Sequence, residues 1–143
     1  MPIRDIEAFA AARQGGPRLL ANRGANGIDG VLSTGVGMAL AGKGRITILI
    51  GDVAFAHDHG ALMLMRDLRP EVSIVIVDNG AGTIFDMLPV AGQGSDTYER
   101  FFATPTRLPI DRLAAAWDLP VARPGTAAEL SEALTGSEGP VLL

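Results

Sequence analysis

Residues 45–85, RITILIGDVAFAHDHGALMLMRDLRPEVSIVIVDNGAGTIF, decide the fold that we predict. Two short apolar runs, 46–50 and 72–77, each end in glycine with acidic or amide residues, and a helix-length segment separates them. Such runs are typical of adjacent buried strands in a parallel sheet. Ligands of open α/β sheets bind beyond the carboxyl ends of the strands, where Asp52 and Asn79 would lie. Oxygen donors at two neighbouring strand ends suit Mg²⁺ bound together with a phosphate group.

The remaining apolar patterns extend this pair of strands into an alternating series of strands and helices. The alternation predicts a three-layer α/β domain with a parallel sheet. Strands are expected at residues 18–21, 46–50, 72–77, 121–122 and 141–143. Helices are expected from residue 2 to about 15, from 28 or 29 to 41, at 59–68, at 112–117 and after residue 126, with short helical pieces at 84–87 and 98–102.

The chemistry of single residues predicts where several helices begin. Asp58, Asp111 and Thr126 are candidate N-caps, because short side chains with an oxygen atom accept hydrogen bonds from the free N–H groups of a first turn. Glu129 follows Thr126 by three residues and would complete a capping box.

The helix expected to end near residue 41 is rich in small residues, which would let it pack close to the sheet. Gly35 and Gly37 are among them, and each costs a helix about 1 kcal/mol relative to alanine. We expect close packing against the sheet to compensate for this cost.

Composition restricts the class of protein. With 143 residues, of which 48% are hydrophobic and 20% charged, the chain is expected to fold as one globular domain. A net charge of −4 argues against a nucleic-acid partner. The apolar runs are too short to cross a bilayer, and the absence of cysteine fits a cytoplasmic protein. Because the sequence stops in what reads as the start of a buried strand, we expect a fragment of a longer polypeptide.

Simpler interpretations of the two strand ends are open at this point. Asp52 could be the N-cap of the following helix, and residues 78–80 could form a plain turn, since Asn-Gly favours turns. His57 and His59 are not favoured as metal ligands, because residues two apart do not share a helix face. No glycine-rich nucleotide fingerprint stands in its required context.

A family resemblance combines these signals. Gly51-Asp52, 26 intervening residues and Asn79 resemble the thiamine-diphosphate motif that runs from Gly-Asp-Gly to Asn-Asn. Residues 22–30, NRGANGIDG, and 79–85, NGAGTIF, resemble the 2-succinyl-5-enolpyruvyl-6-hydroxy-3-cyclohexene-1-carboxylate synthases of menaquinone biosynthesis. The resemblance continues to Arg123-Pro124 and makes residues 1–143 the single C-terminal, diphosphate-binding domain of a three-domain enzyme. Two residues depart from the superfamily motif, Val53 and Asp78.

The resemblance implies two cofactors, thiamine diphosphate and Mg²⁺. The Asp52 carboxylate, the side-chain oxygen of Asn79 and the backbone carbonyl of Ala81 would bind the metal ion. Diphosphate oxygens and water would complete an octahedron, which is the geometry that Mg²⁺ prefers.

The same resemblance assigns the residues that would hold the organic cofactor. The N–H groups of Asp52 and Val53, directly after Gly51, would face the diphosphate at a strand-to-helix turn. Ile28 would be the apolar wedge that bends the cofactor into a V shape. The backbone around Asn26 and Ile28 would hydrogen-bond the aminopyrimidine. An ordinary core isoleucine is the alternative for Ile28.

The implied reaction decarboxylates 2-oxoglutarate and adds the succinyl carbanion to isochorismate. Arg4 and Arg23 would bind substrate carboxylates, which suits the bidentate guanidinium group. Ile84 and Phe85 would line the apolar side of the substrate pocket.

No catalytic residue is assigned to this fragment. In the superfamily, the glutamate that activates the aminopyrimidine lies on the N-terminal domain of a partner subunit. We therefore expect the full-length protein to be a homo-oligomer, a dimer or tetramer. The fragment alone is expected to be inactive and to bind thiamine diphosphate weakly or not at all.

Two other functions are kept as alternatives. The first is the same domain of another thiamine-diphosphate enzyme, such as an acetolactate synthase or a 2-oxoacid decarboxylase. Residues 22–24 and 84–85 argue against it, because by the resemblance they set the substrate. The second is a non-catalytic, receiver-like α/β module with Asp52 as phosphoacceptor, which would need further acidic, Thr and Lys residues at strand ends.

Overall fold

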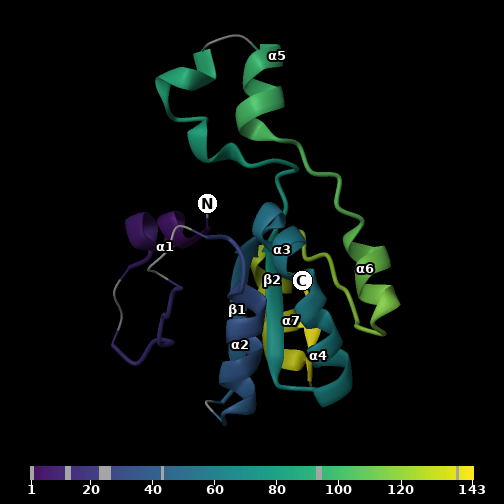
Figure 1. The fold of residues 1–143 in the computed structure, drawn as a ribbon. Coiled ribbons are helices and arrows are strands. Elements are labelled where there is room, and N and C mark those ends of the chain that lie inside the picture. Colours follow the sequence, from purple (N-terminus) through teal and green to yellow (C-terminus); the bar gives the residue numbers. More distant parts are fainter. Residues whose placement is uncertain (1, 12–13, 23–26, 43, 93–94, 138) are drawn as a thin grey trace.

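The structure is a computed structural model that describes residues 2–11, 14–22, 27–42, 44–92, 95–137 and 139–143. Helices and strands alternate along the chain, as the sequence predicts (Figure 1). The elements are α1 (Pro2–Phe9), α2 (Val31–Leu40), β1 (Ile46–Gly51), α3 (Asp52–Asp58), η1 (His59–Ala61), α4 (Leu62–Leu68), β2 (Val72–Val77), η2 (Thr83–Phe85), η3 (Pro89–Gly92), α5 (Ser95–Tyr98), η4 (Glu99–Ala103), α6 (Ile110–Ala116), α7 (Ala127–Gly136) and β3 (Val141–Leu142).

The sheet is parallel, with the strand order β1-β2-β3. β1 and β2 pair in full register, from Ile46 opposite Val72 to Gly51 opposite Val77. The continuous helical segment α3-η1-α4 forms the crossover between them. The residues that follow the two strands, Asp52 and Asp78, therefore leave the same edge of the sheet, as predicted.

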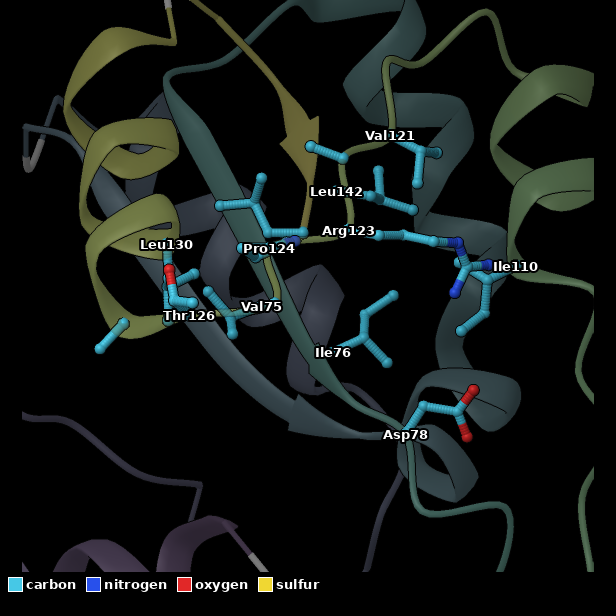
Figure 2. Close-up of a pocket in the computed structure, with 14 residues that line it drawn as sticks. Val75, Ile76, Asp78, Ile110, Val121, Arg123, Pro124, Thr126, Leu130 and Leu142 are labelled. Carbon is cyan, nitrogen blue, oxygen red and sulfur yellow. The ribbon is translucent and has the colours of Figure 1, made fainter.

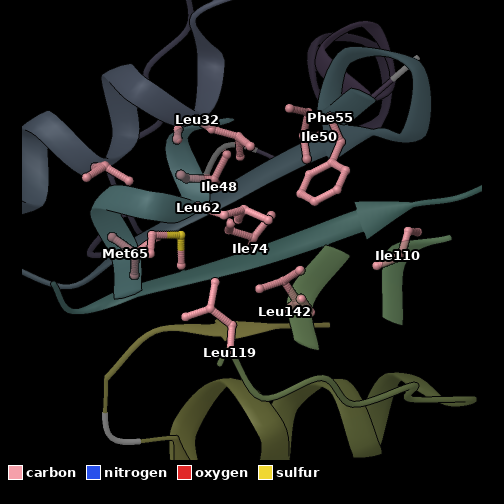
Figure 3. Close-up of a cluster of buried hydrophobic side chains, with 14 residues drawn as sticks. Leu32, Ile48, Ile50, Phe55, Leu62, Met65, Ile74, Ile110, Leu119 and Leu142 are labelled. Atoms are coloured by element: carbon pink, nitrogen blue, oxygen red, sulfur yellow. The ribbon is translucent and has the colours of Figure 1, made fainter. Parts of the chain in front are cut away.

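Helices cover both faces of this sheet, so the predicted three-layer arrangement is confirmed. α2 and α4 lie on one face and α7 on the other (Figures 1 and 3). The main core lies against the α2–α4 face, where fully buried Phe55, Leu62 and Met65 meet Ile48 and Ile74 (Figure 3). α7 has no buried residue and covers its face less tightly.

Gly35 explains how closely α2 approaches β1. A Cβ atom at this position would lie 2.4 Å from Cδ1 and 2.6 Å from Cγ1 of Ile48, distances that real Cβ contacts do not reach. A Cβ atom at Gly37 would meet nothing within 4 Å. Of the two glycines that were expected to permit close packing, only Gly35 does so.

Asp58 holds the N-cap position of η1, as predicted, but its side chain makes no capping hydrogen bond there, and the N-cap predicted at Asp111 is wrong. Asp58 is the last residue of α3, and its carboxylate accepts hydrogen bonds from the backbone N–H (2.9 Å) and Oγ (3.0 Å) of Ser33 in the first turn of α2. The N-cap of α2, Gly30, has no side chain, so Asp58 supplies the missing acceptor from another helix. Asp111 lies inside α6, whose N-cap is Pro109, and accepts a hydrogen bond from Arg123.

The predicted Thr126 cap of α7 is confirmed, but the Glu129 side chain binds a different backbone N–H from that of a regular capping box. Thr126 Oγ1 accepts a hydrogen bond from the Glu129 N–H at 3.2 Å, as predicted. The Glu129 carboxylate accepts from the N–H of Gly125, at 2.7 Å, one residue before the donor of a regular capping box.

The strand predicted at residues 18–21 is wrong. This segment belongs to no strand, and its Leu19 and Leu20 are exposed. An apolar run becomes a strand only where a neighbour pairs with its backbone, and none of the three described strands does. The first helix is also shorter than predicted, ending at Phe9, and the strand at 121–122 is reduced to a single bridge from Val121 to Leu142.

Between β2 and α6 the chain leaves the sheet as a helical excursion, residues 83–103, which carries η2, η3, α5 and η4 (top of Figure 1). Two backbone hydrogen bonds close its base: Gly82 N–H to the Ala103 carbonyl (2.6 Å) and Thr106 N–H to the Gly80 carbonyl (2.8 Å). The short helical pieces predicted near 84–87 and 98–102 both lie here.

Candidate functional site

Asp52 is a buried carboxylate at the end of β1. Gly51 has an extended backbone (φ −83°, ψ 158°) and is the N-cap of α3, so Asp52 is the first helical residue and the N-cap interpretation of Asp52 is wrong. Only 3% of Asp52 is exposed, and its Oδ2 accepts a hydrogen bond from Thr106 Oγ1 at 2.5 Å. None of the ion pairs that the structure records among the described residues involves Asp52. Because burying a charge without a cation is costly, this carboxylate suits a cationic ligand.

The loop after β2 is a tight turn held by its own side chains. Asp78 Oδ1 accepts a hydrogen bond from the Gly80 N–H at 3.0 Å, and Gly80 has a left-handed φ of 75°. Asn79 Nδ2 donates to Thr83 Oγ1 at 2.7 Å, and Asn79 Oδ1 accepts a long bond of 3.4 Å from the Ala81 N–H. The turn expected at 78–80 is therefore present. It leaves the Asn79 Oδ1 only weakly engaged.

Thr106 joins the two strand ends. Its hydroxyl donates to Asp52, and its backbone N–H donates to the carbonyl of Gly80. Val53 lies beside the same loop, since its Cγ2 is 3.9 Å from the position that a Cβ would take at Gly82. The structure thus brings Asp52 and Val53 to the loop that carries Asn79 and Ala81.

Sequence reasoning missed Thr106. Its neighbours, Thr104 and Pro105, carry part of the family resemblance, but a hydroxyl 54 residues from its acceptor leaves no local pattern.

Asp78, the departure from the superfamily motif, faces a different region. It lines a cavity of about 400 Å³ together with Arg123, Thr126 and apolar residues of β2 and α7 (Figure 2). A hydrogen bond to Asp111, with a small contribution from the charge of Asp78, raises the pKa of the exposed Arg123 above its usual value. The Asp78 carboxylate is therefore shared between the Gly80 N–H and this cavity.

The residues expected to hold the organic cofactor are only partly described. Gly51, Asp52 and Val53 form the junction of β1 and α3, where first-turn N–H groups have no acceptor within the helix. Ile28 lies in a bend before α2 and is 43% exposed, so its interpretation as a core residue is wrong. Asn26 lies outside the described residues.

The expected substrate residues lie on two elements. Arg4 is on the exposed face of α1 and donates to the Glu7 carboxylate at 2.8 Å. Pro2 Cδ lies 3.7 Å from the Cβ position of Gly51, so α1 begins beside the end of β1. Arg23 lies outside the described residues.

The two apolar substrate residues are on the excursion. Ile84 is 50% and Phe85 37% exposed, and the Phe85 ring packs edge-on against the Phe102 ring, with 5.8 Å between the ring centroids. The Tyr98 ring stacks on the Phe102 ring, and the Tyr98 hydroxyl donates a hydrogen bond to the Asp86 carboxylate. Partial desolvation and this hydrogen bond raise the pKa of Tyr98 to about 12.

The donor chemistry at the strand ends selects among metal ions. The described residues contain no group of three or more His, Cys, Asp or Glu side chains that could hold a metal ion. The set at the strand ends has one carboxylate, one amide oxygen and backbone carbonyls, which are hard oxygen donors of the kind that Mg²⁺ binds together with phosphate oxygens. The site therefore fits Mg²⁺ with a phosphorylated ligand better than a transition metal.

No described helix has both the length and the apolar character needed to span a membrane.

Relatives of this chain are much longer proteins. This chain is 43% identical over 141 residues to the 2-succinyl-5-enolpyruvyl-6-hydroxy-3-cyclohexene-1-carboxylate synthase of Myxococcus xanthus (strain DK1622). The match covers 97% of this chain and 24% of that protein. The protein of the same name from Thermobifida fusca (strain YX) is 44% identical over 141 residues, 95% of this chain and 25% of that protein. The resemblance inferred from the motifs is confirmed, and the chain spans about a quarter of these relatives.

Two solved structures share the fold. The thiamine diphosphate-dependent 4-hydroxybenzoylformate decarboxylase of Rhodococcus jostii RHA1 superposes with a TM-score of 0.65 at 21% identity, covering 78% of this chain and 21% of that one. The benzoylformate decarboxylase of Polynucleobacter necessarius superposes with a TM-score of 0.64 at 19% identity, and the match covers 78% of this chain and 22% of that one. The predicted fold class is thus confirmed.

Family membership follows from a match over most of the chain. Residues 7–143 match the family described as "Thiamine pyrophosphate enzyme, C-terminal TPP binding domain". This assignment leaves no room for a receiver-like module, and the burial of Asp52 is a poor setting for a phosphoacceptor. The chain therefore belongs to the thiamine pyrophosphate enzyme family, in which it corresponds to the C-terminal TPP binding domain.

Proposed function

We propose that this chain binds thiamine diphosphate and Mg²⁺ as the C-terminal domain of a synthase that decarboxylates 2-oxoglutarate and adds the succinyl carbanion to isochorismate. One observation supports the cofactor site most strongly: the buried Asp52 carboxylate is tied through Thr106 to the loop of Asn79 and Ala81. The names of the relatives support the reaction.

The metal ion would be held by the Asp52 carboxylate, the Asn79 side-chain oxygen and the Ala81 carbonyl. A divalent cation there would compensate the buried charge of Asp52, which forms no recorded ion pair among the described residues. The long contact from Asn79 Oδ1 to the Ala81 N–H is weak enough to be exchanged for a metal bond.

Thiamine diphosphate, when bound, supplies the nucleophilic carbon and the electron sink that decarboxylation of a 2-oxo acid requires. The N–H groups of Asp52 and Val53, after Gly51, would bind its diphosphate at the start of α3. The exposed side chain of Ile28 is available to pack against the cofactor, and the backbone near Asn26 would bind the aminopyrimidine.

Substrate carboxylates would be bound by Arg4 and Arg23. The Arg4–Glu7 pair is solvent-exposed, and such pairs contribute at most about 1 kcal/mol, so a substrate carboxylate can replace Glu7. Ile84 and Phe85 expose apolar surface on η2, which would contact the carbon skeleton of the substrate.

The proposed enzyme needs parts that are not among these residues. The activating glutamate would come from an N-terminal domain of a partner subunit in a cytoplasmic homo-oligomer, with no nucleic acid or membrane involved. We therefore expect the 143-residue chain alone to show no turnover and to bind thiamine diphosphate weakly or not at all.

Two measurements test the proposal. Isothermal titration of the chain with thiamine diphosphate and Mg²⁺ measures binding, and conversion of 2-oxoglutarate with isochorismate measures activity. Turnover by these 143 residues would contradict the incomplete site.

The substrate assignment needs the longer polypeptide. We expect its consumption of 2-oxoglutarate to depend on isochorismate. Preference for pyruvate without isochorismate would favour an acetolactate synthase-like or decarboxylase function instead.

A further inference from the structure

Thr106 makes the two hydrogen bonds that connect the ends of β1 and β2 at the site. The hydroxyl donates to Asp52 Oδ2 at 2.5 Å, and the backbone N–H donates to the Gly80 carbonyl at 2.8 Å. The residue is half-buried and is part of the base of the helical excursion, which its backbone N–H helps to close. One residue therefore contacts the predicted metal ligand on one strand end and the loop with the other two ligands.

Each bond has a separate geometric effect. Rotation of an aspartate carboxylate about its last torsion has broad minima, so a donor to one oxygen fixes the direction of the other. The bond to Oδ2 thus orients Oδ1 of Asp52. The bond to the Gly80 carbonyl holds the peptide next to Ala81, and the Gly82–Ala103 bond holds the peptide on its other side.

Mg²⁺ requires nearly ideal octahedral geometry, so its affinity depends on how well its ligands are placed before it binds. Groups that orient metal ligands typically change metal affinity by about 10–100-fold when they are removed. Thr106 has the contacts of such a group, although it would not touch the metal ion.

We propose that Thr106 is a positioning residue that sets Asp52 against the Asn79–Ala81 loop for divalent-metal binding. This inference rests on the proposed metal site. The hydroxyl carries the effect on Asp52, whereas the backbone N–H remains in every variant and keeps the loop in place.

The test compares Thr106→Val, which keeps the shape and removes the donor, with Thr106→Ser, which keeps the donor. Thr47→Val is the matched control, because Thr47 is an exposed residue on β1 remote from the strand end. Mn²⁺ affinity is measured by electron paramagnetic resonance of the free ion, with and without thiamine diphosphate. We expect T106V to bind about 10-fold more weakly or worse, and T106S and T47V to stay within about 3-fold of the unchanged chain.

Amide hydrogen exchange at residue 106 separates positioning from simple structural support. The bond to the Gly80 carbonyl should protect this amide equally in T106V and T106S. If T106V loses this protection together with affinity, the effect lies in the loop and the proposal is overturned. Thr106→Ala, which does not bury a methyl group against the carboxylate, replaces T106V if the latter fails to fold.

The remaining outcomes distinguish this inference from the proposed function. Unchanged Mn²⁺ affinity in T106V, or equal loss in T106V and T106S, overturns the role of Thr106 and leaves the metal site intact. Unchanged affinity in Asp52→Asn, or no Mn²⁺ binding by the longer polypeptide in the presence of thiamine diphosphate, contradicts the metal site itself and the role of Thr106 with it.

Discussion

Two glycines of α2 should respond to the same substitution with opposite signs. Gly37→Ala adds a methyl group that meets nothing within 4 Å, so it should gain the full helix preference of alanine, about 1 kcal/mol. Gly35→Ala gains the same preference but places Cβ 2.4 Å from Ile48 Cδ1 in the buried core. Overpacking costs about 1–3 kcal/mol, so the net effect should be a loss of about 1 kcal/mol.

Urea denaturation followed by circular dichroism measures both changes against the unchanged chain. The expected difference in free energy of unfolding between the two variants is about 2 kcal/mol, well above the error of the method. Stabilisation by G35A as large as that by G37A would refute the close approach of α2 to β1. The packing of the sheet that carries Asp52 would then be wrong as well.

Three further substitutions test the contacts around the site. Asp58→Ala should lower the free energy of unfolding by about 1 kcal/mol, because it removes the acceptor of the first turn of α2; a change below about 0.3 kcal/mol in urea denaturation would speak against that cap. Gly80→Ala should cost about 1–2 kcal/mol in the same assay, since φ is 75°, and Gly80→Asn should cost less; equal costs would exclude a strained left-handed turn. Tyr98 is the only tyrosine, so tyrosinate absorbance should show its pKa near 12. Because the pKa of Tyr98 is raised in the folded state, the protonated Tyr98 side chain contributes to the free energy of unfolding in full below pH 10. This contribution is lost as the pH rises toward 12. Tyr98→Phe should abolish this loss, and titration of Tyr98 near its usual pKa would contradict the bond to Asp86.

The parts of the fold that could be predicted are those with local causes. The apolar runs before Gly51 and Asp78 became β1 and β2 within a residue of their expected ends, because buried parallel strands need continuous apolar sequence. Residues 18–21 have a similar character but no partner strand, and pairing is not visible in a short window of sequence. Thr126 capped α7 because its acceptor role is local.

The site shows the same division. Asp52 and Asn79 were predicted as metal ligands from their places after two strands, together with a family resemblance. Asp58 and Asp111 are residue types that often cap helices, and they stand before apolar helical segments. Their carboxylates nevertheless bind Ser33 and Arg123, which lie elsewhere in the chain. The contact of Thr106 with Asp52 could not be predicted, since only the folded chain brings these two residues together.

The most direct test of the metal site is to locate a paramagnetic ion on the chain. Mn²⁺ is titrated into ¹⁵N-labelled protein, and the loss of amide signals is followed in the unchanged chain, in Asp52→Asn and in Asp118→Asn. The last is a matched control, because Asp118 is exposed and its left-handed φ of 52° suits asparagine. We predict that the Val53 and Ala81 signals broaden first in the unchanged chain and in D118N, but not in D52N. Equal broadening of these signals in D52N, or broadening elsewhere only, would contradict a metal site shared by the ends of β1 and β2.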